Sequence, residues 1–443
     1  RRFWSMNARL DARGDSRLPL TSGLCFDDGM MPRWARSIMR SLLAAMVWLP
    51  AAPVTAQGFL NLGKNATIIP LPEIITDPNE GTTFGFLPVI LVTDDDQSIR
   101  RIIAPDVRFN DITGVYPMFR LFEYPSENQK LLLQAGKATK IGEYFEALYS
   151  GERLFRGWLD LNFRAFHEND PFERFFGFGN DTVDGSETNY TGDTTIVVGA
   201  VGLNLPYHLQ AGTQIRVRDE HVRRGGVNSV AQLVDNPTLT GTPGIEPATI
   251  VGQRFGFRYD TRDAYVVPTE GSLADGGIEV VDEALGSSAS YVKYSLEGRS
   301  FQSLRRDKTF ILAFQGVLDY VQGGDRAPFY ERSRLGGVSS LRAFGSNRFV
   351  DNHRCFLRVE LRTNVWEPAF LPQQFNVRGH LELAPFLEMG RVFNSSRTFP
   401  LSDPHVDGGV GLRAVVAPQV VAYVDFGTSG SGPSVFTGVD YPF

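Results

Sequence analysis

The chain of 443 residues is poor in the groups from which metal sites, disulfides and nucleic-acid surfaces are built. Its two cysteines, Cys25 and Cys355, cannot form a disulfide framework or a cysteine-ligated metal site. The formal net charge is −6, so no basic surface for nucleic acid is expected. The six histidines are dispersed, and the chain contains no G-x-S-x-G nucleophile motif. We therefore expect no metal, no cofactor, no catalytic residue and no enzymatic activity.

Long apolar runs are also lacking, which excludes membrane-spanning helices in the mature chain. The one short run, residues 42–49, follows Arg33, Arg36 and Arg40 and precedes small residues. This layout is that of a secretory signal peptide, so we expect residues 1–56 to be upstream sequence and a cleaved signal. No later run approaches the roughly 18 residues that a spanning helix needs. An exported chain of this kind can cross a membrane only as a closed barrel.

Glycine and phenylalanine are abundant, with 45 and 33 copies, as in proteins with many tight turns and much aromatic surface. Residues 157–168, 253–260 and 355–365 alternate strictly between apolar and polar side chains. In the last of these segments Glu360 lies on the polar face. Such alternation is compatible with a half-buried soluble sandwich as well as with a transmembrane barrel.

Three features favour the barrel. The strands are long, their polar faces carry charges of both signs, and Tyr441 and Phe443 share a face of the last strand. In Gram-negative outer-membrane barrels such a terminal aromatic strand is an assembly signal. We therefore predict an all-β protein, a closed antiparallel transmembrane β-barrel of about 16 strands over residues 82–443. Residues 57–81 are predicted to be a periplasmic linker or plug.

The sequence RLGGVSSLRAFGSNRF, at 334–349, stands out within a long connection between two strands. Its segment LGGVSSLRAF resembles the loop-six motif of the BamA/TamA-like outer-membrane assembly-factor superfamily, also called the bacterial surface antigen family. Four more motifs of that family match in order: FFGFGNDT at 175–182, FRYDTRDAYVVPTEGS at 257–272, RVELR at 358–362 and FLEMG at 386–390. The resemblance runs from about residue 80 to the end of the sequence.

The resemblance implies that a long external loop folds back into the lumen and is locked there. The implied lock consists of Arg342, Phe344, Glu360, Glu388 and Gly390. A guanidinium presents a rigid fork of donors to carboxylates, so Arg342 is expected to pair with Glu360 and Glu388.

The sequence also departs from the family pattern. Ala343 stands where the family has glycine, and Glu388 replaces an aspartate. Residues 57–81 are too few for a POTRA module, which has about 75 residues in the family. The resemblance therefore implies a short member that lacks POTRA domains.

By this resemblance the chain acts in outer-membrane protein insertion or polypeptide translocation. Its expected partners are outer-membrane lipids and an unfolded outer-membrane client or a periplasmic protein. Gly85 and Pro88 interrupt the predicted first strand, which favours a barrel seam that can open. The alternative is a passive or gated pore, or a surface-exposed structural barrel without insertase activity.

Overall fold

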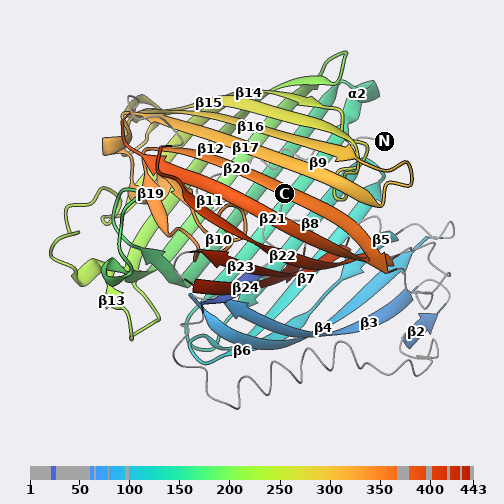
Figure 1. Cartoon of the computed structure of the whole chain (residues 1–443), viewed down its shortest axis with the longest axis horizontal. Helices are drawn as coiled ribbons and strands as arrows, with labels where there is room; N and C mark the ends of the chain where they lie inside the picture. Colours follow the sequence, from blue (N-terminus) through green and yellow to red (C-terminus); the bar gives the residue numbers. More distant parts are fainter. Residues whose placement is uncertain are drawn as a thin grey trace.

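The structure is a computed structural model of the whole chain. It describes residues 21–25, 60–63, 66–77, 79–94, 99–366, 379–395, 402–416, 420–429 and 432–439. One sheet of 22 strands dominates it, and β18 and β19 form a separate pair (Figure 1). The expected all-β class is confirmed. Among the described residues, no helix is long and apolar enough to span a membrane.

The strands of the first half are β1 (Thr21–Cys25), β2 (Leu60–Gly63), β3 (Ala66–Asp77), β4 (Gly81–Thr93), β5 (Ile99–Ile103), β6 (Asp106–Asn110), β7 (Gly114–Ser126), β8 (Gln129–Lys137), β9 (Glu143–Arg153), β10 (Leu159–Phe175), β11 (Thr188–Asn204) and β12 (Leu209–Arg224). The strands of the second half are β13 (Ala231–Gln232), β14 (Ala248–Asp260), β15 (Gly271–Val281), β16 (Tyr291–Ser303), β17 (Phe310–Gln322), β18 (Ser333–Leu335), β19 (Phe349–Asp351), β20 (His353–Trp366), β21 (Gly379–Phe393), β22 (His405–Val416), β23 (Val420–Ser429) and β24 (Gly432–Val439). The short helices are α2 (Leu154–Gly157), η2 (Asp184–Ser186), η3 (Leu233–Asp235), η4 (Glu283–Leu285), η5 (Gly324–Arg326) and η6 (Phe329–Glu331).

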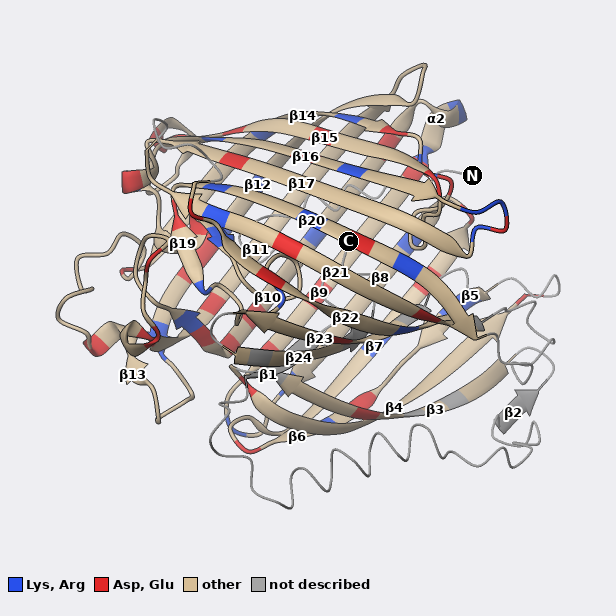
Figure 2. Cartoon of the chain, in the orientation of Figure 1, with Lys and Arg blue, Asp and Glu red and all other residues tan. Residues whose placement is uncertain are grey.

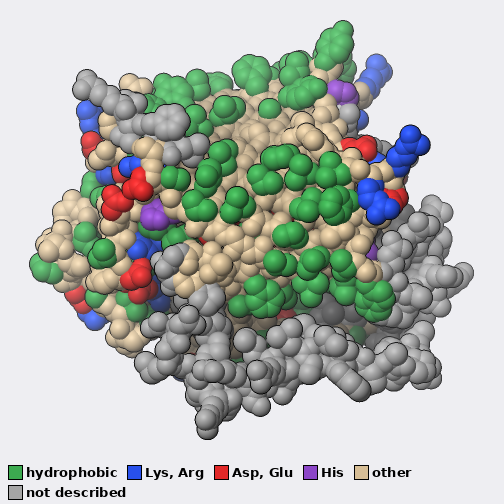
Figure 3. Space-filling model, viewed as in Figure 1, with side chains coloured by type: hydrophobic (Ala, Val, Ile, Leu, Met, Phe, Trp, Pro, Cys, Tyr) green, Lys and Arg blue, Asp and Glu red, His purple; other side chains and the backbone are tan. Residues whose placement is uncertain are grey.

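The alternation of the sequence places polar side chains inside the barrel and apolar ones outside. On β12, Arg216 and Arg218 are each 1% exposed. The neighbouring apolar residues Ile215 and Val217 are 55% and 39% exposed. Successive side chains of a strand point to opposite faces, so the apolar set forms the outer surface. Figure 3 shows apolar side chains over much of the visible outer face, and Figure 2 shows charged residues of both signs along the strands of the barrel wall.

Consecutive strands pair antiparallel around the sheet from β3 to β24. β5 and β6 together occupy one position between β4 and β7. Counted in this way, eighteen positions run through β3, β4, β5 with β6, β7 to β12, β14 to β17 and β20 to β24. The sheet curls until β24, and β1 paired to it, lie against β3.

The count differs from the expected 16 at two places. β3 pairs with β4 along its length, inside the segment expected to be a linker or plug at 57–81. The sequence does not predict this strand because it contains Pro70 and Pro72, and proline usually argues against the interior of a strand. The second place is the segment 129–149, which supplies two strands as the β8–β9 hairpin. Its turn contains no Asn-Gly or Asp-Gly signal, so the sequence does not mark it as a hairpin.

Long connections gather at one end of the barrel, on the left in Figure 1. They join β10 to β11, β12 to β14 and β17 to β20. The last of these, residues 323–352, carries η5, η6, β18 and β19 and is buried over most of its length. It is called the inner loop below.

Candidate functional site

The inner loop narrows into a closed turn before it reaches the barrel wall. β18 pairs with β19, so that Ser333 lies opposite Asp351 and Leu335 opposite Phe349. Gly336 follows with φ +110°, and a Cβ there would lie 2.2 Å from the backbone oxygen of Gly345. Only glycine fits this position, because other residues rarely adopt such a φ and the added carbon would overlap that oxygen.

The turn points the Arg342 side chain into a group of carboxylates on three strands. Its Nε lies 2.6 Å from Glu388 Oε1, its Nη1 2.5 Å from Asp425 Oδ2 and its Nη2 3.2 Å from Glu360 Oε2. The guanidinium also lies 3.5 Å from the ring centre of Phe386, and Arg342 is fully buried. Burial lowers the pKa of Arg342, but the three carboxylates outweigh it and the net shift is upward. The side chain is therefore a buried cation held by charge-assisted bonds from three directions.

The backbone around Arg342 is held as well. Its N–H donates to Glu388 Oε2 at 2.7 Å, and the N–H of Ala343 donates to Asp407 Oδ2 at 2.7 Å. Ser434 on β24 donates its hydroxyl to the Arg342 carbonyl at 3.1 Å. The loop is thereby tied to β21, β22, β23 and β24 together, next to the edge of the sheet.

A second set of arginines surrounds the same carboxylates. Arg358 Nε lies 2.5 Å from Glu388 Oε1, and Arg362 Nε lies 2.8 Å from Glu360 Oε1. Arg413 donates from Nη2 to Glu360 Oε2 at 2.6 Å. All of these side chains are fully buried, so removal of one partner would leave another charge without compensation.

Apolar contacts complete the docked loop. Phe344 packs edge to face against Phe349, with ring centres 5.2 Å apart. Gly390 lies beneath the loop, where a Cβ would come within 3.0 Å of Leu335 Cδ1. A side chain at 390 would therefore require Leu335 of the loop to shift by a few tenths of an ångström.

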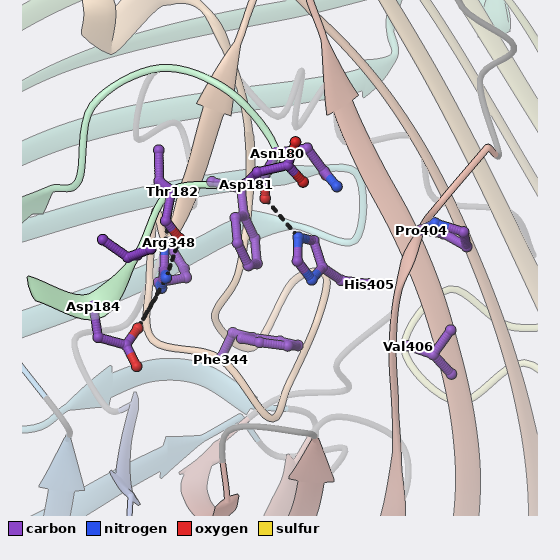
Figure 4. A pocket seen from close by; sticks show the side chains of 11 residues that line it. Asn180, Asp181, Thr182, Asp184, Phe344, Arg348, Pro404, His405 and Val406 are labelled. Atoms are coloured by element: carbon purple, nitrogen blue, oxygen red, sulfur yellow. Dashed lines mark hydrogen bonds and ion pairs between the residues drawn. The ribbon is translucent and has the colours of Figure 1, made fainter. Parts of the chain in front are cut away.

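A cavity of about 480 Å³ adjoins the loop (Figure 4). His405 Nε2 lies 2.7 Å from the backbone oxygen of Asn180. Arg348 binds Asp184 at 2.8 Å and the Thr182 hydroxyl at 2.8 Å. The 176–187 connection, the inner loop and the start of β22 thus meet around this cavity.

The structure brings together all five residues implied for the lock: Arg342, Phe344, Glu360, Glu388 and Gly390. Ala343 does not have a positive φ, so the alanine in place of glycine causes no backbone strain. Tyr441 and Phe443 lie outside the described residues, and their role as an assembly signal stays a prediction.

Sequence reasoning missed the remaining charged members of the network, which are Asp407, Asp425, Arg358, Arg362 and Arg413. Their position on the polar faces of β20, β22 and β23 was the available signal. In the part of the chain that the structure describes, no group of three or more metal-ligating side chains occurs.

Comparison with known proteins places the chain in a family. A model described as the Omp85 superfamily domain matches residues 127–427. The structure of BamA from Haemophilus ducreyi lacking POTRA domains 1–3 is similar at a TM-score of 0.51 and 16% identity, over 92% of this chain and 78% of that one. CdiB from Escherichia coli matches at a TM-score of 0.47 and 11% identity, over 86% of this chain and 64% of that one. At such identities the likeness to BamA shows the fold alone.

Proposed function

The chain belongs to the Omp85 superfamily, and we propose that this outer-membrane β-barrel inserts or translocates polypeptides at a seam between β24 and β3. The observation that carries the proposal is the partner of β24. On the side away from β23, its edge pairs antiparallel with the separate segment β1, with Thr21 opposite Gly438 and Cys25 opposite Ser434. β1 lies within residues 1–56, which are expected to be removed with the signal peptide, so in the mature chain this stretch of the β24 edge is open to another strand. An edge that accepts an extended segment in this way can also accept a strand of a client.

The first strands of the sheet support an openable seam. Pro70 on β3 lies opposite Pro88 on β4. Neither proline has an N–H to donate, so the ladder is weakened at this point. The strand on this side of the seam is therefore held to its neighbour β4 less tightly than a regular strand would be.

We further propose that the network around Arg342 is a structural lock of the lumen. The arginine binds acids on β20, β21 and β23, and Ser434 extends the contact to β24. With these strands held to the loop as one body, the β24 edge keeps its shape while the seam opens. The lock contributes no chemical step.

Outer-membrane lipids are one partner of the barrel, through its apolar outer face. The second proposed partner is an unfolded outer-membrane protein or a periplasmic protein that delivers it. The alternative function is a pore. The polar lining of the lumen favours it, and the inner loop inside the lumen would then limit the conductance.

Reconstitution into liposomes tests the proposal. We expect the purified protein to accelerate insertion of a urea-unfolded barrel client, compared with empty liposomes and with liposomes that hold an unrelated outer-membrane barrel. Ion conductance is recorded from the same preparation. If the protein conducts ions but does not accelerate client insertion, the proposed insertion activity is contradicted and the pore function is supported.

A further inference from the structure

The inner loop carries a second buried charge, and this one is negative. Glu331 ends η6 and is 2% exposed. Arg216 donates from Nη1 and Nη2 to its two carboxylate oxygens at 2.8 and 2.7 Å. Arg218 Nη1 lies 3.1 Å from Oε1, and the Tyr291 hydroxyl donates to Oε2 at 2.7 Å. Both oxygens of Glu331 are therefore fully used.

The partners of Glu331 belong to a different wall from those of Arg342. Arg216 and Arg218 project inward from β12, and Tyr291 begins β16. In Figure 1, β12 runs behind β20 and β21. Burial raises the pKa of Glu331, but the two guanidinium groups outweigh it and lower the pKa overall, so the carboxylate is charged at neutral pH.

Each of the two charges has its own apolar cluster beside it. Next to Glu331, the loop residues Phe329 and Tyr330 pack with Phe175, Tyr190 and Leu233. Next to Arg342, the loop residues Leu341 and Phe344 pack with Phe356 and Val392. The guanidinium of Arg218 lies 4.4 Å from the ring centre of Tyr330 and so joins the charge to the cluster. The loop thus has two separate docking sites, eleven residues apart in sequence.

We propose that Glu331 is a second positioning residue of the inner loop, and that the opposite charges of Glu331 and Arg342 fix the direction in which the loop crosses the lumen. In the reverse direction, Glu331 would take the place of the cation that binds Glu360, Glu388 and Asp425. Arg342 would take the place of the carboxylate that binds Arg216 and Arg218, which would keep only their other partners, Glu279 and Glu220. Like charges in a buried site are strongly unfavourable, so only one arrangement is stable. The loop acts as a strut between β12 and the strands next to the seam, whether the barrel inserts clients or conducts ions.

The strut predicts that the two ends can be released separately. Reporter cysteines are placed at Ser333, beside the Glu331 site, and at Ser340, beside the Arg342 site, in a protein whose own cysteines are replaced by serine. Ser333 and Ser340 are 1% and 3% exposed, so maleimide labelling of either reporter requires local release of the loop. The variants Ser333→Cys and Ser340→Cys are each combined with Glu331→Gln.

We expect Glu331→Gln to raise the labelling rate at position 333 by about 100-fold, the change in population for loss of a buried ion pair. The rate at position 340 should rise much less, because Arg342 still holds that end. The matched control is Glu143→Gln, which removes the same charge from an exposed pair with Lys137 on the β8–β9 turn. It should change neither rate.

Three outcomes would overturn the proposal. One is an unchanged rate at position 333 in Glu331→Gln. Another is an equal rise at both positions together with a lower unfolding temperature of the barrel, which would make Glu331 a general stabilising residue. The third concerns the charge exchange Glu331→Arg with Arg216→Glu, which should slow labelling at position 333 relative to Glu331→Arg alone. Labelling as fast as in that single variant would exclude charge as the cause.

Discussion

At the scale of single residues, the contribution of Arg342 to the docking of the inner loop depends on the groups around its side chain. Three carboxylates and an aromatic face hold it in a fully buried site, and three further arginines bind two of the same carboxylates. A buried pair of this kind is strongly destabilised when one partner is removed, although it need not exceed an apolar packing in net stability. Its value to the protein lies in fixing one loop position.

Arg342→Ala should therefore lower the stability of the folded barrel by about 3–5 kcal/mol. Arg342→Lys should fall in between, because an ammonium keeps the charge but cannot reach three carboxylates in the guanidinium geometry. The measurement is the temperature at which the folded band disappears on gels of heated samples. Arg305→Ala is the control, since that side chain is 66% exposed in a surface pair. An unchanged temperature for Arg342→Ala would contradict the lock.

Gly336 allows an equally local test. Gly336→Ala should undock the loop, because the added carbon would lie 2.2 Å from the Gly345 oxygen at a φ of +110°. Gly345→Ala in the same turn should be tolerated, because its Cβ would lie 3.4 Å from Asn79 Oδ1, which is close to an ordinary van der Waals contact. Limited proteolysis of the loop measures both variants. Equal resistance of the two variants to protease would argue against the turn geometry.

At the scale of elements, the motif FRYDTRD explains the short connection between β14 and β15. Asp260 accepts from the backbone N–H and the guanidinium of Arg262, at 3.0 and 2.9 Å. Asp263 accepts from the N–H groups of Thr269 and Glu270, at 2.8 and 3.1 Å. Both acids are therefore turn-forming residues that end one strand and start the next.

The pH dependence of this turn follows from Asp263. Burial raises its pKa, but hydrogen bonds from Thr269, Glu270 and Lys308 outweigh it and lower the pKa to about 2. A lowered folded-state pKa means that the stabilisation is complete above the unfolded value of about 3.9 and is lost as the pH falls through about 2. The amide shift of Thr269 in an NMR titration should change near pH 2 and should not titrate in Asp263→Asn. A midpoint near 4 would show that the bonds are not formed.

At the scale of the whole molecule, the described strands of the barrel form one continuous sheet whose ladders differ in length and regularity. Regular long ladders join β10, β11 and β12 through their centres. At the other extreme β24 pairs with a five-residue segment, and the first full strand contains two prolines. Stability is expected to follow this difference along the sheet.

Hydrogen exchange measures the difference directly. Amides of β24 and β3 should exchange much faster than those of β11. Exchange in β24 should also be faster in the chain that lacks residues 1–56 than in the unprocessed chain, whose β1 pairs with the β24 edge. Amides of β11 in the shortened protein are the internal control, because their partners are unchanged. Uniform slow exchange from β3 to β24 would describe a sealed barrel and would remove the support for a seam.

The sequence by itself determined the class of fold and the inward face of most strands, because alternation is a local property of a strand. It also singled out Arg342 and Glu360, through a loop motif and a parity pattern. Only the tertiary structure decided that Asp425 meets Arg342 and that Glu331 meets Arg216, which are 83 and 115 residues apart. Such contacts depend on the register of many strands relative to one another and on the path of the loop across the lumen. Neither can be read from the sequence of a single segment.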